Sequence, residues 1–96
     1  MALVAVTASI AASDASERKI VIENMQFTPA TAIAKAGDRI TWVNQDLVAH
    51  TATANGAFDS GPIAPGHSWS AAKLKPGRYV VACTLHPTMK STLLVE

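Results

Sequence analysis

Short runs of β-forming residues, separated by turn signals, are the feature of this chain that most restricts its fold. β-branched and aromatic residues are concentrated in segments such as 19–23, 39–44 and 78–83, and Asn55-Gly56 is a strong turn signal. No segment shows sustained helical periodicity. Because turns recur about every 8–12 residues, the sequence predicts an all-β fold, a two-sheet antiparallel Greek-key β-sandwich of about 7–8 strands.

The remaining elements follow the same pattern. The segment 58–66 holds two prolines and two glycines, and is expected to be a loop that crosses between the sheets. Trp42 and Trp69 are expected in the core and on a sheet face, and Met25 is expected to pack inside the sandwich. Further strands are predicted at residues 31–35, 48–54, 68–74 and 91–95.

Length and charge limit the organisation and the partners. The chain has 96 residues, of which 49% are hydrophobic, so it can bury one core and not two. We therefore expect a single domain over residues 19–96. The net charge is +1, with acidic and basic residues scattered, which gives no basic face for nucleic acid.

Residues 1–18 are expected to be an export-signal remnant or an N-terminal extension. The segment is apolar and rich in small residues, but its first basic residue is Arg18, whereas a complete signal begins with Lys or Arg. The alternative is an extra strand at a sheet edge, with alternating Leu3, Ala5 and Thr7. Both interpretations stay open, and the apolar run is too short to span a bilayer.

The segment 83–89, Cys-Thr-Leu-His-Pro-Thr-Met, contains the only cysteine of the chain. It spaces a thiolate, an imidazole and a thioether evenly, and this soft set of donors suits copper. A mononuclear blue-copper site also needs a second imidazole, for which His50 is the candidate. Taken singly, Cys83, His86 and Met89 are more typical of a buried cysteine, a surface histidine and core filler. Their combination favours a metal site. His67 is expected to be an exposed turn residue.

Several motifs together carry a family resemblance. They are Thr28-Pro29, the segment 37–44 (Gly-Asp-Arg-Ile-Thr-Trp-Val-Asn), His50, and the segments 58–61, 65–66, 75–79 and 83–89. Over residues 19–96 the chain resembles the cupredoxins, the small type 1 blue copper proteins. Within that family it is most similar to the amicyanins and plastocyanins. The resemblance implies a cupredoxin-like sandwich.

The resemblance also implies a site and a function. His50, Cys83 and His86 would be the in-plane ligands of one type 1 copper ion, and Met89 the axial ligand. The protein would be a soluble electron-transfer protein that cycles between Cu(II) and Cu(I) and catalyses no reaction. It would be a monomer, periplasmic or otherwise extracytoplasmic, with no nucleic-acid partner and no stable membrane insertion.

In this family the outer edge of the second histidine faces solvent, so a redox donor and acceptor are expected to dock near His86. Small, short-lived interfaces of redox partners suit an apolar surface. The residues expected to form this apolar patch are Leu47, Val48, Pro62, Ile63, Leu85 and Pro87.

Two positions depart from the family pattern. Thr51 follows the first histidine where an asparagine commonly ties the ligand-bearing segments together, and a hydroxyl makes fewer hydrogen bonds than an amide. Leu85 stands where amicyanin-like loops usually carry proline, which lacks an N–H. We therefore expect the Leu85 N–H to donate to the Cys83 sulfur and to favour Cu(I).

Two other functions fit the same residues. A copper carrier or storage protein would use the same ligands and release Cu(I) readily to a chelator. An enzyme would use Cys83 as nucleophile and His86 as base. A site with all its coordination positions filled by protein argues against an enzyme, because catalytic metal sites keep one position open.

Overall fold

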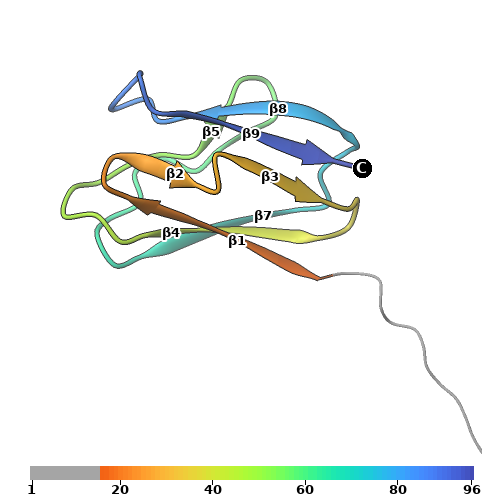
Figure 1. Ribbon diagram of the computed structural model, residues 1–96, viewed down its shortest axis with the longest axis horizontal. Coiled ribbons are helices and arrows are strands. Elements are labelled where there is room, and N and C mark those ends of the chain that lie inside the picture. The colour runs from red at the N-terminus through yellow and green to blue at the C-terminus, as the bar shows by residue number, and fades with distance from the viewer. Residues whose placement is uncertain (1–15) are drawn as a thin grey trace, which may run out of the picture.

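The computed structural model describes residues 16–96, which form nine strands in two packed sheets (Figure 1). The four-stranded sheet has the order β2-β1-β4-β7, and the five-stranded sheet has the order β3-β9-β8-β5-β6. The strands are β1 Glu17–Glu23, β2 Gln26–Thr28, β3 Thr31–Ala34, β4 Arg39–Asn44, β5 Thr53–Ala54, β6 Phe58–Asp59, β7 Ser68–Ala72, β8 Gly77–Ala82 and β9 Lys90–Val95. The predicted all-β sandwich is confirmed.

Most strand pairs are antiparallel, as predicted, but the sheets are mixed, so the antiparallel description is only approximate. β1 pairs with β4 in parallel, and β3 pairs with β9 in parallel. The reason lies in the segment that joins β2 to β3. These two strands run in the same direction but belong to different sheets, so the chain changes sheet around Pro29 without reversing (Figure 1). The next reversal therefore brings β4 back alongside β1 in the same direction.

The core forms from side chains that alternate along the strands. Trp42 on β4 is fully buried, and its ring lies 5.3 Å from that of Phe58 and 5.7 Å from that of Trp69, measured between centroids. Trp42 and Trp69 are also a cross-strand pair of β4 and β7. Aromatic pairs at such spacings add to the stability gained from burial alone. The two tryptophans occupy the predicted core and sheet-face positions.

Met25 was predicted to pack inside the sandwich, and this prediction is wrong. Asn24 and Met25 form the two-residue turn between β1 and β2, with φ of 56° and 60°. Positive φ at both central residues is the geometry of a type I′ hairpin turn, whose twist matches the paired strands. This geometry places Met25 at the tip of the hairpin, where 43% of its surface is exposed.

The strand predicted at 48–54 is shorter than expected. β5 contains only Thr53–Ala54, and His50 instead forms an isolated bridge with Ile63. Ser60 explains part of the change, because its Oγ accepts the Ala52 N–H at 2.8 Å, in place of a neighbouring strand. The ligand candidate therefore lies in an irregular segment that two loops hold in place.

The expected domain start at Lys19 falls inside β1, which begins at Glu17. The alternatives for the N-terminal segment concern residues that, apart from 16–18, lie outside the described part of the chain. Within residues 16–96 there is no helix of the length and apolar character needed to cross a membrane.

Asp38 anchors the end of the sandwich that is remote from residues 83–89. Its side chain is buried, and its carboxylate accepts the N–H groups of Lys35 and Ser16, the Ser16 hydroxyl and the Arg18 Nε–H. The N–H groups of Lys35 and Ser16, which outweigh the effect of burial, hold the pKa of Asp38 below its usual value.

Replacing Asp38 with Asn is expected to lower the melting temperature near neutral pH. A depressed folded-state pKa means that the carboxylate stabilises the fold above the unfolded-state pKa of about 3.9, and that this contribution is lost as pH falls through the folded-state value. The difference in Tm between Asp38→Asn and the wild type should be largest above about pH 5 and shrink in acid. Circular dichroism melts measure it, with the exposed Glu23→Gln as control. A difference that does not change with pH would contradict the assignment.

Candidate metal centre

The segment 83–89 folds into a tight loop at one end of the sandwich. Cys83 follows directly after β8, and its N–H donates to the Met89 carbonyl at 3.1 Å, which closes the loop. Inside the loop, the His86 N–H donates to the Cys83 carbonyl at 3.3 Å and the Met89 N–H donates to the His86 carbonyl at 2.9 Å. The loop thus consists of two successive turns, and Cys83, His86 and Met89 lie at the ends of these turns.

Asn44, the last residue of β4, fixes the segment that carries His50. Its side chain is fully buried, and Nδ2 donates to the carbonyls of Val48 at 2.9 Å and Ile63 at 2.8 Å. The backbones of His50 and Ile63 exchange two hydrogen bonds, of 3.2 and 2.7 Å. The position of His50 is therefore determined by contacts with β4 and with the loop that follows β6.

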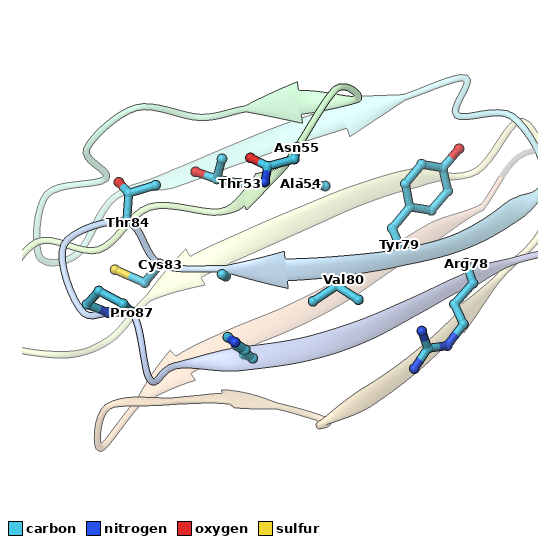
Figure 2. A pocket seen from close by; sticks show the side chains of 11 residues that line it. Thr53, Ala54, Asn55, Arg78, Tyr79, Val80, Cys83, Thr84 and Pro87 are labelled. Atoms are coloured by element: carbon cyan, nitrogen blue, oxygen red, sulfur yellow. The ribbon is translucent and has the colours of Figure 1, made fainter.

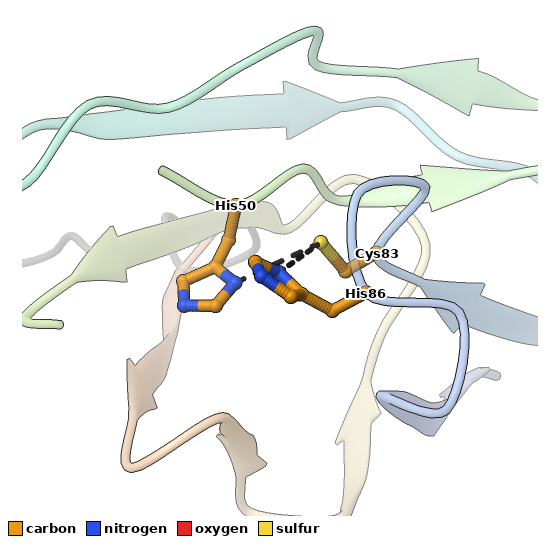
Figure 3. Close-up of side chains that lie close together, drawn as sticks. All are labelled: His50, Cys83 and His86. Atoms are coloured by element: carbon orange, nitrogen blue, oxygen red, sulfur yellow. Dashed lines mark hydrogen bonds between the residues drawn. The ribbon is translucent and has the colours of Figure 1, made fainter. Parts of the chain in front are cut away.

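His50, Cys83 and His86 converge, although His50 is remote from the other two in sequence (Figure 3). The Cys83 Sγ lies 3.7 Å from His50 Nδ1 and 3.6 Å from His86 Nδ1, and the three ligand atoms all lie within 4.8 Å of one another. A transition ion about 2.0–2.1 Å from nitrogen and about 2.3 Å from sulfur holds S and N about 3.6–3.8 Å apart. These side chains therefore fit a metal ion.

Burial supports this interpretation. His50 and Cys83 are fully buried, and His86 is half-buried. Met89 is buried in the core at the same end of the sandwich, as the last residue of the loop. A set of one thiolate and two imidazoles beside a thioether, shielded from water, is the donor chemistry that selects copper among the common transition metals.

Asp46 orients the His50 ring. Its Oδ2 lies 2.7 Å from His50 Nε2, and because a carboxylate only accepts hydrogen bonds, Nε2 donates to Asp46 and Nδ1 is the ring nitrogen that faces the sulfur. Partial burial alone would raise the pKa of Asp46, but hydrogen bonds from the Met25 N–H, His50 and the Asn24 N–H hold that pKa below its usual value. The sequence alone did not single out Asp46. The only sign of its role there is that an acidic residue stands shortly before the candidate histidine.

The sulfur of Cys83 accepts a hydrogen bond from an unexpected residue. The Thr51 N–H donates to Sγ at 3.4 Å. Among residues 16–96, no hydrogen bond joins the Leu85 N–H to this sulfur. Leu85 lies at the outer corner of the turn closed by His86 and Cys83, with half of its surface exposed. The backbone donor to the Cys83 sulfur is therefore Thr51, not Leu85.

Comparison with known proteins agrees with the donor chemistry. The model of the cupredoxin-like domain matches residues 1–95. The chain belongs to the cupredoxin family. Amicyanin-alpha of Methylorubrum extorquens is 30% identical over 92 residues, a match that spans 85% of this chain and 74% of the relative. Amicyanin of Paracoccus versutus is 26% identical over 95 residues, which is 91% of this chain and 72% of the relative.

Solved cupredoxin structures share the fold. The Cu(I) structure of an amicyanin variant superposes with a TM-score of 0.77 at 22% identity, covering 82% of this chain and 81% of the other. The purple cupredoxin from Nitrosopumilus maritimus also gives a TM-score of 0.77, at 21% identity, over 82% of this chain and 99% of the other. At these identities the likeness establishes the architecture of this cupredoxin.

Five of the six apolar residues expected to form a docking patch are exposed. Leu47 is 94% exposed, and Val48 and Leu85 are about half exposed. Pro62 and Pro87 are exposed as well. Contrary to the prediction, Ile63 is not part of this exposed group. It pairs with His50 and lies in the core, where only 4% of its surface is exposed. His67 is exposed in a turn and lies outside the metal cluster, as predicted.

Replacing Asp46 with Ala is expected to weaken metal binding by about 10–100-fold, the usual effect of losing a partner that orients a histidine ligand. Titration with Co²⁺, followed through the thiolate-to-metal absorption, measures the affinity without any redox step. Gln45→Ala, at the exposed neighbouring position, is the matched control. Equal affinities in Asp46→Ala and Gln45→Ala would show that the carboxylate does not position His50.

Proposed function

We propose that this cupredoxin is a type 1 copper electron-transfer protein, with His50, Cys83 and His86 as in-plane ligands and Met89 as axial ligand. The convergence of two imidazole nitrogens on the Cys83 sulfur is the observation that carries the proposal. The position of Met89 at the end of the loop supports its role. Bound copper supplies one-electron exchange between Cu(II) and Cu(I).

The protein's contribution is to hold the ligands in one arrangement. Asn44 fixes the His50 segment, Asp46 fixes the His50 ring, and Thr51 donates to the thiolate. These contacts restrain the ligand-bearing segments, and a restrained set of ligands needs little rearrangement when the oxidation state changes. With four protein ligands no position is left for a substrate, which supports a carrier of electrons over an enzyme.

Partners dock, on this proposal, at the apolar patch formed by Leu47, Val48, Leu85, Pro62 and Pro87, and electrons pass through His86. His86 is the half-buried member of the cluster, whereas His50 and Cys83 are fully enclosed. A small apolar surface suits a transient complex. The protein acts as a monomer in the periplasm or another extracytoplasmic compartment, a location that rests on the family and on the character of residues 1–18.

The ligand assignment predicts the spectrum of the copper form. After one equivalent of Cu(II), the wild type should show an intense blue thiolate-to-copper band and narrow copper hyperfine splitting in EPR. Cys83→Ser should lose the band, since its only thiolate is gone. A colourless or weakly absorbing wild-type complex would overturn the proposal. It would favour the copper carrier or storage function, which rapid loss of Cu(I) to a chelator would then support.

The docking assignment predicts that a charge in the patch slows electron exchange. In a mixture of Cu(I) and Cu(II) protein, Leu47→Asp should lower the self-exchange rate about tenfold, because two like charges meet as two patches approach. NMR line broadening measures this rate. Val80→Asp places the same charge at an exposed position on β8 and should change the rate little. Equal slowing in Leu47→Asp and Val80→Asp would place the exchange surface elsewhere.

A further inference from the structure

A chain of hydroxyl groups runs from the ligand loop to the surface. Thr51 Oγ1 accepts the Thr84 N–H at 2.9 Å and lies 3.3 Å from Thr84 Oγ1. It also lies 2.9 Å from Thr53 Oγ1, which in turn donates to Asp59 Oδ1 at 3.1 Å. Figure 2 shows Thr53 and Thr84 on the same side of the Cys83 end of β8. The four residues thus connect the position after the thiolate with an exposed carboxylate.

The Asp59 carboxylate determines which hydroxyl donates and which accepts in each of these hydrogen bonds. Asp59 only accepts, so the single hydroxyl proton of Thr53 is used on it. Thr53 Oγ1 must then accept from Thr51, which uses the single hydroxyl proton of Thr51. Both lone pairs of Thr51 Oγ1 are left for Thr84, one for its N–H and one for its hydroxyl. Hydrogen bonds aligned in this way polarise and strengthen one another.

We propose that Thr51, aligned by Thr53 and Asp59, is a positioning residue that clamps Cys83 from two sides. On one side its N–H donates to the Cys83 sulfur, and on the other its hydroxyl holds Thr84, the next residue in the loop. Thr51 is buried, which strengthens both contacts. The clamp is a property of the chain itself, and only its effect on copper rests on the proposed function.

Amide hydrogen exchange of Thr84 in the metal-free protein tests the clamp directly. Thr84 is an exposed residue, so protection of its N–H reports the bond to Thr51 rather than burial. Thr51→Val keeps the shape and removes the acceptor, and should speed this exchange at least about tenfold, which corresponds to about 1.4 kcal/mol. Thr51→Ser restores the hydroxyl and should restore most of the protection. Unchanged exchange in a folded Thr51→Val protein would overturn the proposal.

The role of Thr53 and Asp59 is tested by a variant that touches none of the proposed ligands. Thr53→Val leaves Thr51 without its aligned acceptor, and should speed Thr84 exchange by about threefold, less than Thr51→Val, because the backbone bond persists. Thr92→Val, a half-buried threonine on β9 outside the chain of hydroxyls, should leave the exchange unchanged. If Thr53→Val and Thr92→Val behave alike, Thr51 acts without the relay and this part of the proposal fails.

The copper form provides the second readout. With the sulfur less firmly held, Thr51→Val and to a smaller extent Thr53→Val should shift the thiolate-to-copper band, whereas Thr51→Ser and Thr92→Val should match the wild type. If no protein in the series gives a blue complex, the proposed function fails while the exchange data still decide the clamp. If all give the wild-type band, the clamp does not position the thiolate.

Discussion

The buried side chain of Asn44 is the interaction on which the rest of the site depends. It lies at the end of β4, donates to the carbonyls of Val48 and Ile63, and accepts the Asp46 N–H at 2.9 Å. An amide buried in the core costs several kcal/mol, on the order of 2–7, if its groups find no partners. Here each partner is a backbone group of an irregular loop, so satisfying Asn44 also fixes the loops that carry His50 and Asp46.

Further hydrogen bonds connect Asn44 with the candidate ligands. Asp46, placed by that amide, accepts the two N–H groups of the β1–β2 turn and the His50 Nε2–H. His50 then presents Nδ1 to the sulfur of Cys83, and the neighbouring Thr51 holds the thiolate and the residue after it. Polar networks of this kind are stable only when every member is satisfied. The arrangement of the candidate ligands is thus held by contacts within the protein.

Much of the fold could be read from the chain because local patterns specify local structure. The β-forming residues of β4 and β8 placed these strands almost to the residue, and the alternation along β4 agrees with the buried position of Trp42. The pattern failed where side chains outside the segment decide the conformation. The segment 48–54 reads as a strand, but Ser60, Ile63 and Asn44 take hydrogen bonds of Ala52, His50 and Val48. Met25 reads as a core residue, but its turn directs it to solvent.

By itself the sequence determined the all-β class, the close grouping of Cys83, His86 and Met89, and the identity of His50 as the distant candidate. Spacing within one loop is enough to group Cys83, His86 and Met89, since chain connectivity keeps these three residues together. Only the tertiary structure decided that β1 and β4 run in parallel, that Asp46 orients His50, and that hydrogen bonds through the hydroxyls of Thr51 and Thr53 connect Thr84 with the Asp59 carboxylate. These contacts join residues from separate segments, and whether two such groups meet depends on how the sheets pack, which no local pattern encodes.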